Sequence, residues 1–430
     1  MSTSGLLNVV DGIFVGRFIG AQALSAVSLV FPVVMLLTAL TALTGGGMSS
    51  LLARHLGLGA RREAGAVFAG AHGFALALSA GLMLGALILG PGIVSFLAAG
   101  NEPVASLAKA YLLVLILGAP VQFCLGLHAD ALRNEGRSGH IAVLSVIMNL
   151  LNIAANYIAI VLLNLGVAGS AIGTVAAQAV GLMLLLLMRQ RDPALLPLGA
   201  IRQASWLTGW RQILSLGLPL SLSFIGMALV ASTVIVAIGN TAEGHGAYVA
   251  AYGIVTRLLG LAFLPQMAID LTTQSITGNN VGAGRMDRAG AALKLAIGCA
   301  LLWCLGVTLA GMLAGETLGA VFSEDQAVIT AVGLIMRPMT ALYGVTGPIL
   351  VLAMHFQAMG YPLRTAVLTL IKPWILTPTL IVILNTFYSV HGIWIAFPVA
   401  DAALLLVALT IVFRHRAFDT PMTLRSKVDT

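Results

Sequence analysis

Residues 6–19 read LLNVVDGIFVGRFI and place one aspartate, Asp11, inside a run of apolar side chains. An ionisable group at membrane depth costs at least ~2.5–3.5 kcal/mol, and it usually faces a bundle interior or a watery cavity on an ion or proton path. The stretch therefore predicts a membrane-spanning helix that carries a functional carboxylate. The alternative is that Asp11 lies close to a helix end, from which its side chain reaches water.

The composition of the whole chain also indicates a membrane protein. Of the 430 residues, 59% are hydrophobic and only 9% are charged, and the mean hydropathy is +1.01. Soluble globular proteins carry about 25% charged residues. The apolar runs are ~20–30 residues long, which is the length that a helix needs to cross the bilayer, and the alternating segments of a transmembrane barrel do not occur. We predict an all-α polytopic membrane protein, and we interpret the net charge of +7 as a topology signal rather than as a nucleic-acid-binding surface.

Hydropathy, together with Gly, Pro and charged residues at the helix ends, predicts about twelve transmembrane helices. Their approximate ranges are 4–19, 24–52, 64–90, 104–131, 139–164, 167–188, 212–239, 247–277, 288–314, 327–358, 364–385 and 391–413. A hydrophilic connection follows the sixth helix. The predicted regions are an amino-terminal six-helix bundle (1–190), a cytoplasmic linker (191–211), a carboxy-terminal six-helix bundle (212–414) and a cytoplasmic tail (415–430).

The basic residues predict which side of the membrane each loop faces. With this set of helices, eighteen of the 22 Lys and Arg residues, Lys372 among them, lie in or nearest to loops on one side. Lys and Arg accumulate in cytoplasmic loops. We therefore expect a multi-pass protein of the plasma (inner) membrane with both termini in the cytoplasm.

The first predicted helix is shorter than a membrane span. Residues 4–19 extend only ~24 Å at 1.5 Å per residue, whereas the hydrocarbon core is ~30 Å thick. We expect the natural start of the protein to lie upstream of Met1.

The two predicted bundles resemble each other, because glycines recur 223 to 225 positions apart. The matched pairs are Gly57 and Gly282, Gly59 and Gly284, Gly136 and Gly360, and Gly169 and Gly392. Six helices per half preserve the orientation of the chain, so we expect two parallel repeats related by an axis along the membrane normal. Two such bundles would leave a cleft between them, as alternating access requires.

Several motifs resemble those of the multidrug and toxic compound extrusion (MATE) family of transporters. They are VDGIFVGRFIG at 10–20, LRNEG at 132–136, NIAANY at 152–157 and QSITGNNVGAGR at 274–285. The resemblance covers essentially the whole chain and implies a twelve-helix transporter that is not an enzyme. Family members begin with a longer first helix, which agrees with the short helix noted above.

The resemblance also implies a cation- or proton-coupling site in the amino-terminal bundle. Asp11 matches the first-helix aspartate of the family. Asn152 and Asn156 match a polar pair of the fifth helix, and their spacing of one turn makes them face the same way. Thr174 matches a hydroxyl of the sixth helix. Because Asn156 cannot titrate, Asp11 is the expected proton carrier; the alternative is that the amides and the hydroxyl only bond helices together.

The carboxy-terminal bundle departs from the sodium-driven branch of the family. Members of that branch carry acids at the positions of Met227 and Gly347, so a cation site of that kind is in doubt here. Asp270 and Asp401 are the remaining deep acids. We interpret them, with Gln274 and Met227, as candidates for substrate or ion handling. For each acid the alternative is a carboxylate satisfied by a partner or exposed at a helix end.

The expected function is secondary active export of amphipathic, often cationic organic compounds in exchange for H⁺ or Na⁺, by a monomer without a cofactor. One alternative is a flippase of the same superfamily that moves a lipid-linked oligosaccharide. A less favoured alternative is a membrane-embedded enzyme that uses a buried histidine. His72, His128 and His355 show no spacing typical of a metal or catalytic site, and we interpret them as core or interface residues.

Overall fold

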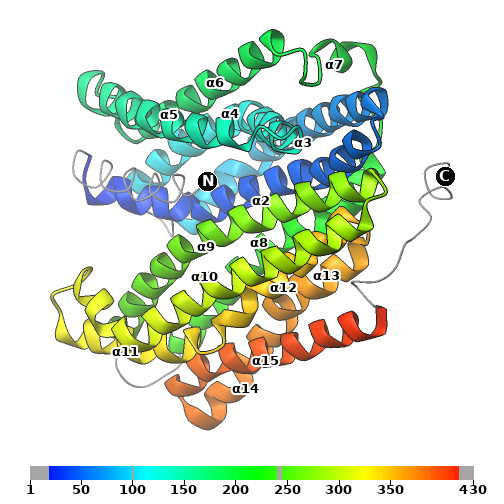
Figure 1. The fold of residues 1–430 in the computed structure, drawn as a ribbon. Helices are drawn as coiled ribbons and strands as arrows, with labels where there is room; N and C mark the ends of the chain where they lie inside the picture. The colour runs from blue at the N-terminus through cyan, green and yellow to red at the C-terminus, as the bar shows by residue number, and fades with distance from the viewer. Residues whose placement is uncertain (1–18, 99–100, 240–244, 416–430) are drawn as a thin grey trace. The chain divides into compact units, whose positions relative to one another are not determined.

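The computed structural model describes residues 19–98, 101–239 and 245–415, and among these residues all regular structure is helical (Figure 1). The α-helices are α2 (Ala21–Gly57), α3 (Arg61–Leu97), α4 (Glu102–Asn134), α5 (Ser138–Tyr157), α6 (Gly166–Arg191), α7 (Gly199–Gln203), α8 (Trp210–Gly239), α9 (His245–Gly282), α10 (Met286–Ala320), α11 (Gln326–Thr340), α12 (Tyr343–Ala358), α13 (Pro362–Leu370), α14 (Thr377–Tyr388) and α15 (Val390–His415). Two π-helical segments, Ile158–Leu162 and Ile371–Leu376, follow α5 and join α13 to α14.

These helices confirm the predicted all-α membrane fold. Within the described residues, ten spans are long and apolar enough to cross a membrane, and α11 with α12 forms an eleventh span that is bent by 48°. Large apolar side chains such as Leu87, Leu313 and Phe413 are more than three-quarters exposed, as expected on surfaces that face lipid. The first predicted helix, which contains Asp11, lies outside the described residues.

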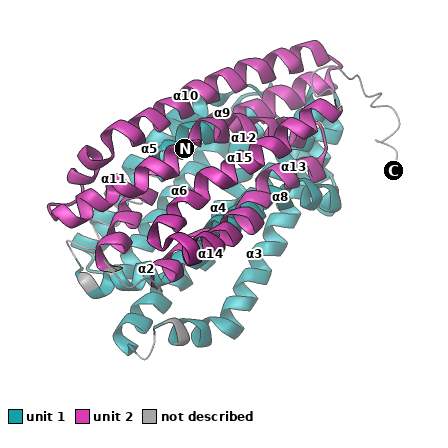
Figure 2. Ribbon diagram, turned by 90° about the horizontal axis from the view of Figure 1, so that it is seen from below, with its two compact units in different colours: residues 1–228, 260–268 teal, residues 229–259, 269–430 magenta. Residues whose placement is uncertain are grey.

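The chain divides into two compact units (Figure 2). Unit 1 comprises the residues up to 228 together with 260–268, and unit 2 comprises residues 229–259 and the chain from 269 onward. The division falls inside α8 and also inside α9, whose residues 260–268 belong to unit 1. The predicted boundaries at 190, 211 and 414 stay predictions, because the division of a structure into compact units need not coincide with the ends of a duplicated sequence.

Two glycines explain why the first half of α8 packs within unit 1. A Cβ atom on Gly217 of α8 would lie 1.9 Å from the carbonyl oxygen of Leu43 on α2. Conversely, a Cβ atom on Gly47 of α2 would lie 2.1 Å from the carbonyl oxygen of Ile213 on α8. The two backbones therefore touch, in the way that small residues permit between membrane helices.

The glycine pairs found in the sequence adopt matching backbone conformations. Gly59 and Gly284 have φ values of +74° and +71°, and Gly136 and Gly360 have φ values of +78° and +85°. This left-handed region favours glycine, since other residues carry a Cβ atom. The turns that follow α2, α4, α9 and α12 are thus the same turns in both halves, which supports the predicted duplication.

A third pair of glycines marks a matching helix contact. A Cβ atom on Gly169 would lie 3.1 Å from the carbonyl oxygen of Ala159, and one on Gly392 would lie 2.1 Å from the carbonyl oxygen of Leu384. Ala159 and Leu384 are themselves 225 positions apart. Each half therefore packs its sixth helix against its fifth through a glycine at the same place.

The break between α11 and α12 is stabilised by a threonine of α10. The Thr308 hydroxyl donates to the carbonyl oxygen of Thr340 (2.9 Å) and accepts the backbone N–H of Gly344 (3.1 Å). These are backbone groups that the interrupted helix leaves without a helical partner, and in lipid they need one. The break at residues 341–342 is thus a built feature of unit 2.

Candidate functional site

Unit 1 contains a chain of neutral polar side chains between α5 and α6. The Asn152 amide donates to the Thr174 hydroxyl (3.0 Å), and the Asn156 amide donates to Oδ1 of Asn152 (3.2 Å). Asn152 and Asn156 are 2% and 0% exposed. The predicted trio therefore does come together, and its amide and hydroxyl oxygens can bind a small cation or hydrogen-bond a carboxyl group.

The local backbone positions this polar chain. A Cβ atom on Gly173 would lie 2.1 Å from Oδ1 of Asn156, so only a glycine lets α6 approach the amide this closely. The π-helical segment Ile158–Leu162 starts two residues after Asn156. Single π-helical turns within helices occur frequently at functional sites. Asp11, the expected carboxylate partner, lies outside the described residues.

Unit 2 contains a charged cluster instead. The Lys372 ammonium of the π-helical segment Ile371–Leu376 pairs with Oδ1 of Asp401 on α15. The Thr346 hydroxyl on α12 donates to the same oxygen (3.2 Å). The Asp401 side chain is 2% exposed and that of Lys372 is 22% exposed. Asp401 is therefore a buried carboxylate held by an ammonium and a hydroxyl.

A second acid lies in the same region. Asp270 on α9 is 6% exposed. Asp270 and Asp401 both contribute to the electrostatic environment of the Tyr343 hydroxyl, and Asp270 contributes to that of Cys304 on α10. Tyr343 is the first residue of α12, directly after the helix break. The charged cluster, defined here as Asp270, Tyr343, Thr346, Lys372 and Asp401, thus draws on four segments of unit 2.

Gln274 and Met227, the other two residues predicted for substrate or ion handling, are not bonded to Asp401. Gln274 is fully buried one turn after Asp270, but its amide donates to Oε1 of Gln357 (2.9 Å), which joins α9 to α12. Met227 belongs to unit 1 and is 53% exposed. The structure therefore groups neither side chain with the hydrogen bonds and ion pair of Asp401.

Lys372 lies inside a membrane span, as the predicted helix 364–385 implies, and it is paired there. The charge count groups it with the nearest cytoplasmic loop, and in the structure it lies ten residues after Pro362, about 15 Å along the span at 1.5 Å per residue. The available signal was its position in the middle of an apolar run, followed by Pro373. A lysine so deep in a span needs a partner, and Asp401 is equally deep in the next span.

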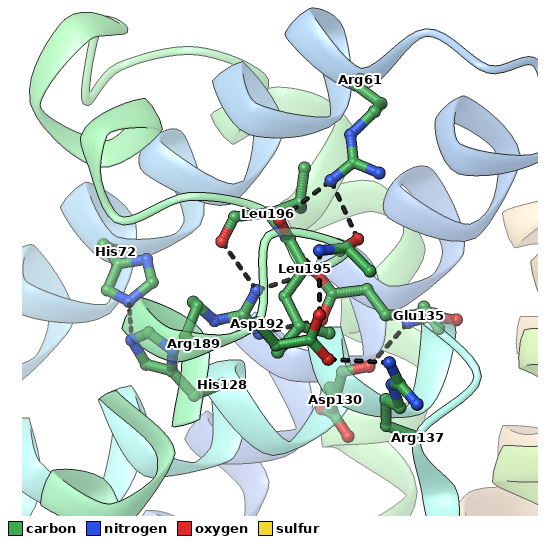
Figure 3. Close-up of polar contacts among 12 residues, drawn as sticks. Arg61, His72, His128, Asp130, Glu135, Arg137, Arg189, Asp192, Leu195 and Leu196 are labelled. Atoms are coloured by element: carbon green, nitrogen blue, oxygen red, sulfur yellow. Dashed lines mark hydrogen bonds and ion pairs between the residues drawn. The ribbon is translucent and has the colours of Figure 1, made fainter. Parts of the chain in front are cut away.

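A separate polar network attaches the linker to unit 1 (Figure 3). Arg189 at the end of α6 donates to both carboxylate oxygens of Glu135 (2.8 and 3.0 Å), and both side chains are at most 4% exposed. Glu135 also accepts the backbone N–H of Leu196 (2.6 Å). This bidentate, buried pair fixes the chain that leaves α6.

Two further arginines bind the same linker. Arg61 at the start of α3 donates to the carbonyl oxygens of Ala194 and Leu195 (2.9 Å each), and Arg137 pairs with Asp192 (2.7 Å) (Figure 3). The predicted cytoplasmic linker is therefore held by charged side chains from α3 and the turn before α5.

His72 and His128 of unit 1 form a buried pair beside this network. His72 Nε2 lies 3.3 Å from His128 Nε2, and His72 Nδ1 lies 2.8 Å from the carbonyl oxygen of Phe68 (Figure 3). Since a carbonyl only accepts, His72 Nδ1 donates to it, and His128 Nε2 then donates to His72 in the neutral pair. His355 of unit 2 is also buried and contacts the Thr277 hydroxyl (3.2 Å).

Fold and polar sites together define a class of protein. The apolar spans contain buried amides and buried carboxylates, and one span contains a partly exposed lysine that pairs with a carboxylate. One span is a broken helix, and two others include π-helical segments. Ionisable residues within transmembrane segments mark ion or substrate paths, and discontinuous helices form the binding sites of secondary transporters. This combination is typical of a polytopic membrane transporter.

Comparison with known proteins identifies the family. The family model described as MatE matches residues 2–158 and 219–383, and the chain therefore belongs to the MATE family of multidrug and toxic compound extrusion transporters. Its members are transporters and not enzymes. The enzyme alternative raised by the sequence is thereby excluded.

Relatives and solved structures cover nearly the whole chain. The chain is 24% identical to a FAD transporter of Shewanella oneidensis (92% of this chain, 87% of the relative) and 25% identical to the multidrug export protein MepA of Staphylococcus aureus (97% and 92%). A crystal structure of a MATE protein in complex with MaL6 superposes with a TM-score of 0.88 at 25% identity (97% and 93%). The chain is thus similar to multidrug efflux transporters.

Proposed function

We propose that this protein is a secondary active multidrug exporter that exchanges H⁺ or Na⁺ for amphipathic, often cationic organic compounds. The observation that carries the proposal is the buried chain of Asn152, Asn156 and Thr174, which supplies oxygen atoms and hydrogen bonds inside unit 1. The names of relatives such as MepA support the multidrug part of the proposal.

In the proposed mechanism, Asp11 is the group that changes charge. An apolar bundle disfavours a carboxylate, whereas amide and hydroxyl neighbours can stabilise either protonation state or help to bind a cation. Binding of H⁺ or Na⁺ at Asp11 favours a rearrangement of the amino-terminal bundle and the outward release of the substrate. Asn152, Asn156 and Thr174 position this group.

The proposed location is the plasma (inner) membrane, with a monomer whose termini are both cytoplasmic. The accumulation of Lys and Arg in loops on one predicted side supports this orientation. The outward direction of export then follows from the inward gradients of H⁺ or Na⁺.

A flavin is a second candidate cargo. The relative from Shewanella oneidensis is named a FAD transporter, and it aligns with 92% of this chain. A flavin nucleotide is anionic, so its export would need a cationic side chain along the path. Lys372 is the cation of the charged cluster and is partly exposed.

The test is dye uptake into everted membrane vesicles under a pH gradient or a sodium gradient, imposed separately. The variants are wild type, Asp11→Asn and, as a matched control, Asp287→Asn at the exposed start of α10. We expect one gradient to drive uptake in wild type and in the control, and Asp11→Asn to abolish it. Equal uptake by Asp11→Asn would contradict the proposal, and uptake of FAD but not of dye would favour the flavin cargo.

A further inference from the structure

A groove of about 390 Å³ lies between α13 and α15 on the surface of unit 2. Its walls include Leu363 and Val367 of α13 and Leu406 and Ile411 of α15. Leu363 and Leu406 are 77% and 67% exposed, so the groove is open to the surroundings of the protein. Both helices belong to apolar spans, and in a membrane these surroundings are lipid. The walls therefore suit a hydrocarbon chain.

One cation, Arg364, also lines the groove. Its guanidinium carbon lies 4.3 Å from the ring centroid of Tyr361 and 5.2 Å from that of Phe356. Phe356 is 1% exposed, and the Tyr361 backbone N–H donates to the Phe356 carbonyl oxygen (2.9 Å), so the turn after α12 holds both rings in place. None of the ion pairs among the described residues includes Arg364. The guanidinium is thus positioned by aromatic rings and not by a carboxylate.

The start of α13 adds positive charge at the same place. A helix carries a partial positive charge at its N-terminus. The first turn of α13 contains no acidic residue, and Tyr361 at the N-cap makes no side-chain capping bond. Arg364 lies two residues after the first residue of the span Pro362–Tyr388, about 3 Å along the helix axis. The positive charge therefore lies near the end of the span, where lipid head groups meet the hydrocarbon.

A second arginine lies at the same end of α15. Arg414 is the last residue of the span Val390–Arg414 and follows Ile411 by three positions, so the two share one face of the helix. The sequence of α13 contains no acid, and the one acid of α15, Asp401, lies ten residues before Ile411 and pairs with Lys372. The helices that form the groove thus place cations, and no acid, at this end.

We propose that this groove binds an anionic phospholipid, whose phosphate accepts hydrogen bonds from Arg364 and whose acyl chain lies along the apolar walls of α13 and α15. The planar guanidinium matches two phosphate oxygens, and stacking on aromatic rings is compatible with that contact. Basic pockets between transmembrane helices bind anionic lipid head groups in this way. Neither the cargo nor the coupling ion takes part in this site, so the inference goes beyond the proposed function and does not depend on it.

Two other occupants fit the groove less well. An amphipathic organic cation would be repelled by Arg364 and by the start of α13. A free phosphate ion would satisfy the arginine but would leave the apolar walls uncovered. A phospholipid with a net negative charge satisfies both parts of the groove.

The first experiment measures lipid affinity by native mass spectrometry of the purified full-length protein in detergent. Dioleoyl phosphatidylglycerol and dioleoyl phosphatidylcholine compete at equal concentration. We expect wild type to retain phosphatidylglycerol preferentially, and Arg364→Gln to weaken its binding about fivefold, as expected for one basic group at a membrane surface. Phosphatidylcholine binding should change less.

The matched control is Arg288→Gln, which removes an exposed arginine from the first turn of α10, another helix of unit 2. This variant should bind phosphatidylglycerol as wild type does. An equal loss in both arginine variants would indicate a general attraction to positive charge and would overturn the proposal. Arg364→Lys keeps the charge without the planar fork, so its affinity should lie between those of wild type and Arg364→Gln.

The second experiment tests the apolar walls through the thermal unfolding midpoint. A lipid that binds the folded protein raises this midpoint. Leu406→Trp fills the groove from an exposed position, and Leu302→Trp, at a leucine of α10 that is 74% exposed, is the control. We expect phosphatidylglycerol to raise the midpoint of wild type and of Leu302→Trp, and to raise that of Leu406→Trp much less. An equal rise in both tryptophan variants would place the lipid elsewhere and refute the proposal.

Inorganic phosphate at the same concentration separates a lipid from a free anion. We expect it to leave the wild-type midpoint unchanged. A rise as large as that caused by phosphatidylglycerol would assign Arg364 to a free anion and overturn the lipid site. These outcomes are independent of dye uptake into vesicles, so the failure of the proposed function and the failure of the lipid site remain distinguishable.

Discussion

The fifth and sixth helices of each half share a scaffold but differ in the chemistry that they carry. In unit 1 the polar positions are Asn152, Asn156 and Thr174, which form a neutral hydrogen-bonded chain. At offsets of 223 to 224 the positions in unit 2 are Leu376, Leu380 and Phe397, whereas the offset of 225 that relates Ala159 to Leu384 gives Thr377 and Ile381 for the two asparagines. With neither offset does unit 2 repeat the two amides of unit 1.

The charged residues of unit 2 likewise correspond to uncharged residues in unit 1. Lys372 corresponds to Met148, Asp401 to Gln178 and Asp270 to Gly45, by offsets of 223 to 225. The charged cluster of unit 2 thus lies one turn away from the position of the neutral chain along both helices. Its counterpart in unit 1 carries no charge.

The helices that face these sites also differ. The fourth helix of unit 1, α4, is continuous from Glu102 to Asn134, whereas its counterpart in unit 2 is broken at residues 341–342. A Cβ atom on Gly118, at the matching place of α4, would lie 2.4 Å from the Val175 side chain. Tight apolar packing thus occupies in unit 1 the place where unit 2 has a break with threonine partners. The duplicated backbone thus keeps its turns and helix contacts in both halves, while the buried polar groups differ between them.

The largest effect should come from removing Asp401. Loss of one partner of a buried ion pair typically costs roughly 3–5 kcal/mol, because the other charge is left uncompensated. We expect Asp401→Asn to lower the thermal unfolding midpoint of the purified protein strongly, and Asp401→Asn/Lys372→Met to recover most of the loss. The matched control in unit 1 is Gln178→Asn, which removes no charge. A double variant as unstable as the single one would show that the pair is not the cause.

Removing the Thr346 hydroxyl should have the next largest effect. A hydrogen bond to a charged group contributes about 1.5–3 kcal/mol, so Thr346→Val should destabilise the protein by that order. In the Asp401→Asn/Lys372→Met background the same substitution should cost much less, because the acceptor is no longer charged. A double-mutant cycle on unfolding midpoints measures this coupling, and equal costs in both backgrounds would refute it.

Substitution by alanine of the glycines at the contact between the fifth and sixth helices should destabilise the two halves by different amounts. Overpacking typically costs about 1–3 kcal/mol. Gly392→Ala should lie at the upper end, since its Cβ atom would approach the Leu384 carbonyl oxygen to 2.1 Å, and Gly169→Ala should lie at the lower end, with 3.1 Å to Ala159. Unfolding midpoints of the two variants provide the comparison. The reverse order would mean that the backbone of unit 2 yields more easily than that of unit 1.

The smallest effect should follow Thr174→Val in unit 1. Hydrogen bonds between neutral side chains of membrane helices contribute ~0.6 kcal/mol on average, so stability should change little. Transport driven by an ion gradient should nevertheless fall, because Thr174 bonds to Asn152 in the proposed coupling site. Thr410→Val, at an exposed hydroxyl of α15, is the control. Normal coupling in Thr174→Val would assign the threonine to helix packing alone.

Much of the site in unit 1 could be predicted from the sequence. Asn152 and Asn156 are one helical turn apart, and their spacing alone makes them face the same way, so a local rule was sufficient. The hydrogen bond from Asn152 to Thr174 required only that α5 and α6 be neighbours, which a short connection between consecutive membrane helices favours.

The site in unit 2 could be predicted only in part. Asp270 and Asp401 were visible as acids in apolar runs, but their relation to each other spans more than a hundred residues. Lys372 was inside the predicted helix 364–385, but a hydropathy profile counts a charge with its nearest loop and does not show its partner; in the structure it lies in a π-helical segment and pairs with Asp401.

By itself, the sequence determined the class of the molecule: apolar length fixes membrane helices, glycines with left-handed φ fix the turns of the repeat, and loop charges indicate a topology. Only the tertiary structure decided which buried charges are compensated. Compensation depends on distances between side chains from helices far apart in the chain, and Coulomb energy and hydrogen bonding respond to those distances rather than to sequence spacing. Lys372 and Asp401 form a pair for that reason.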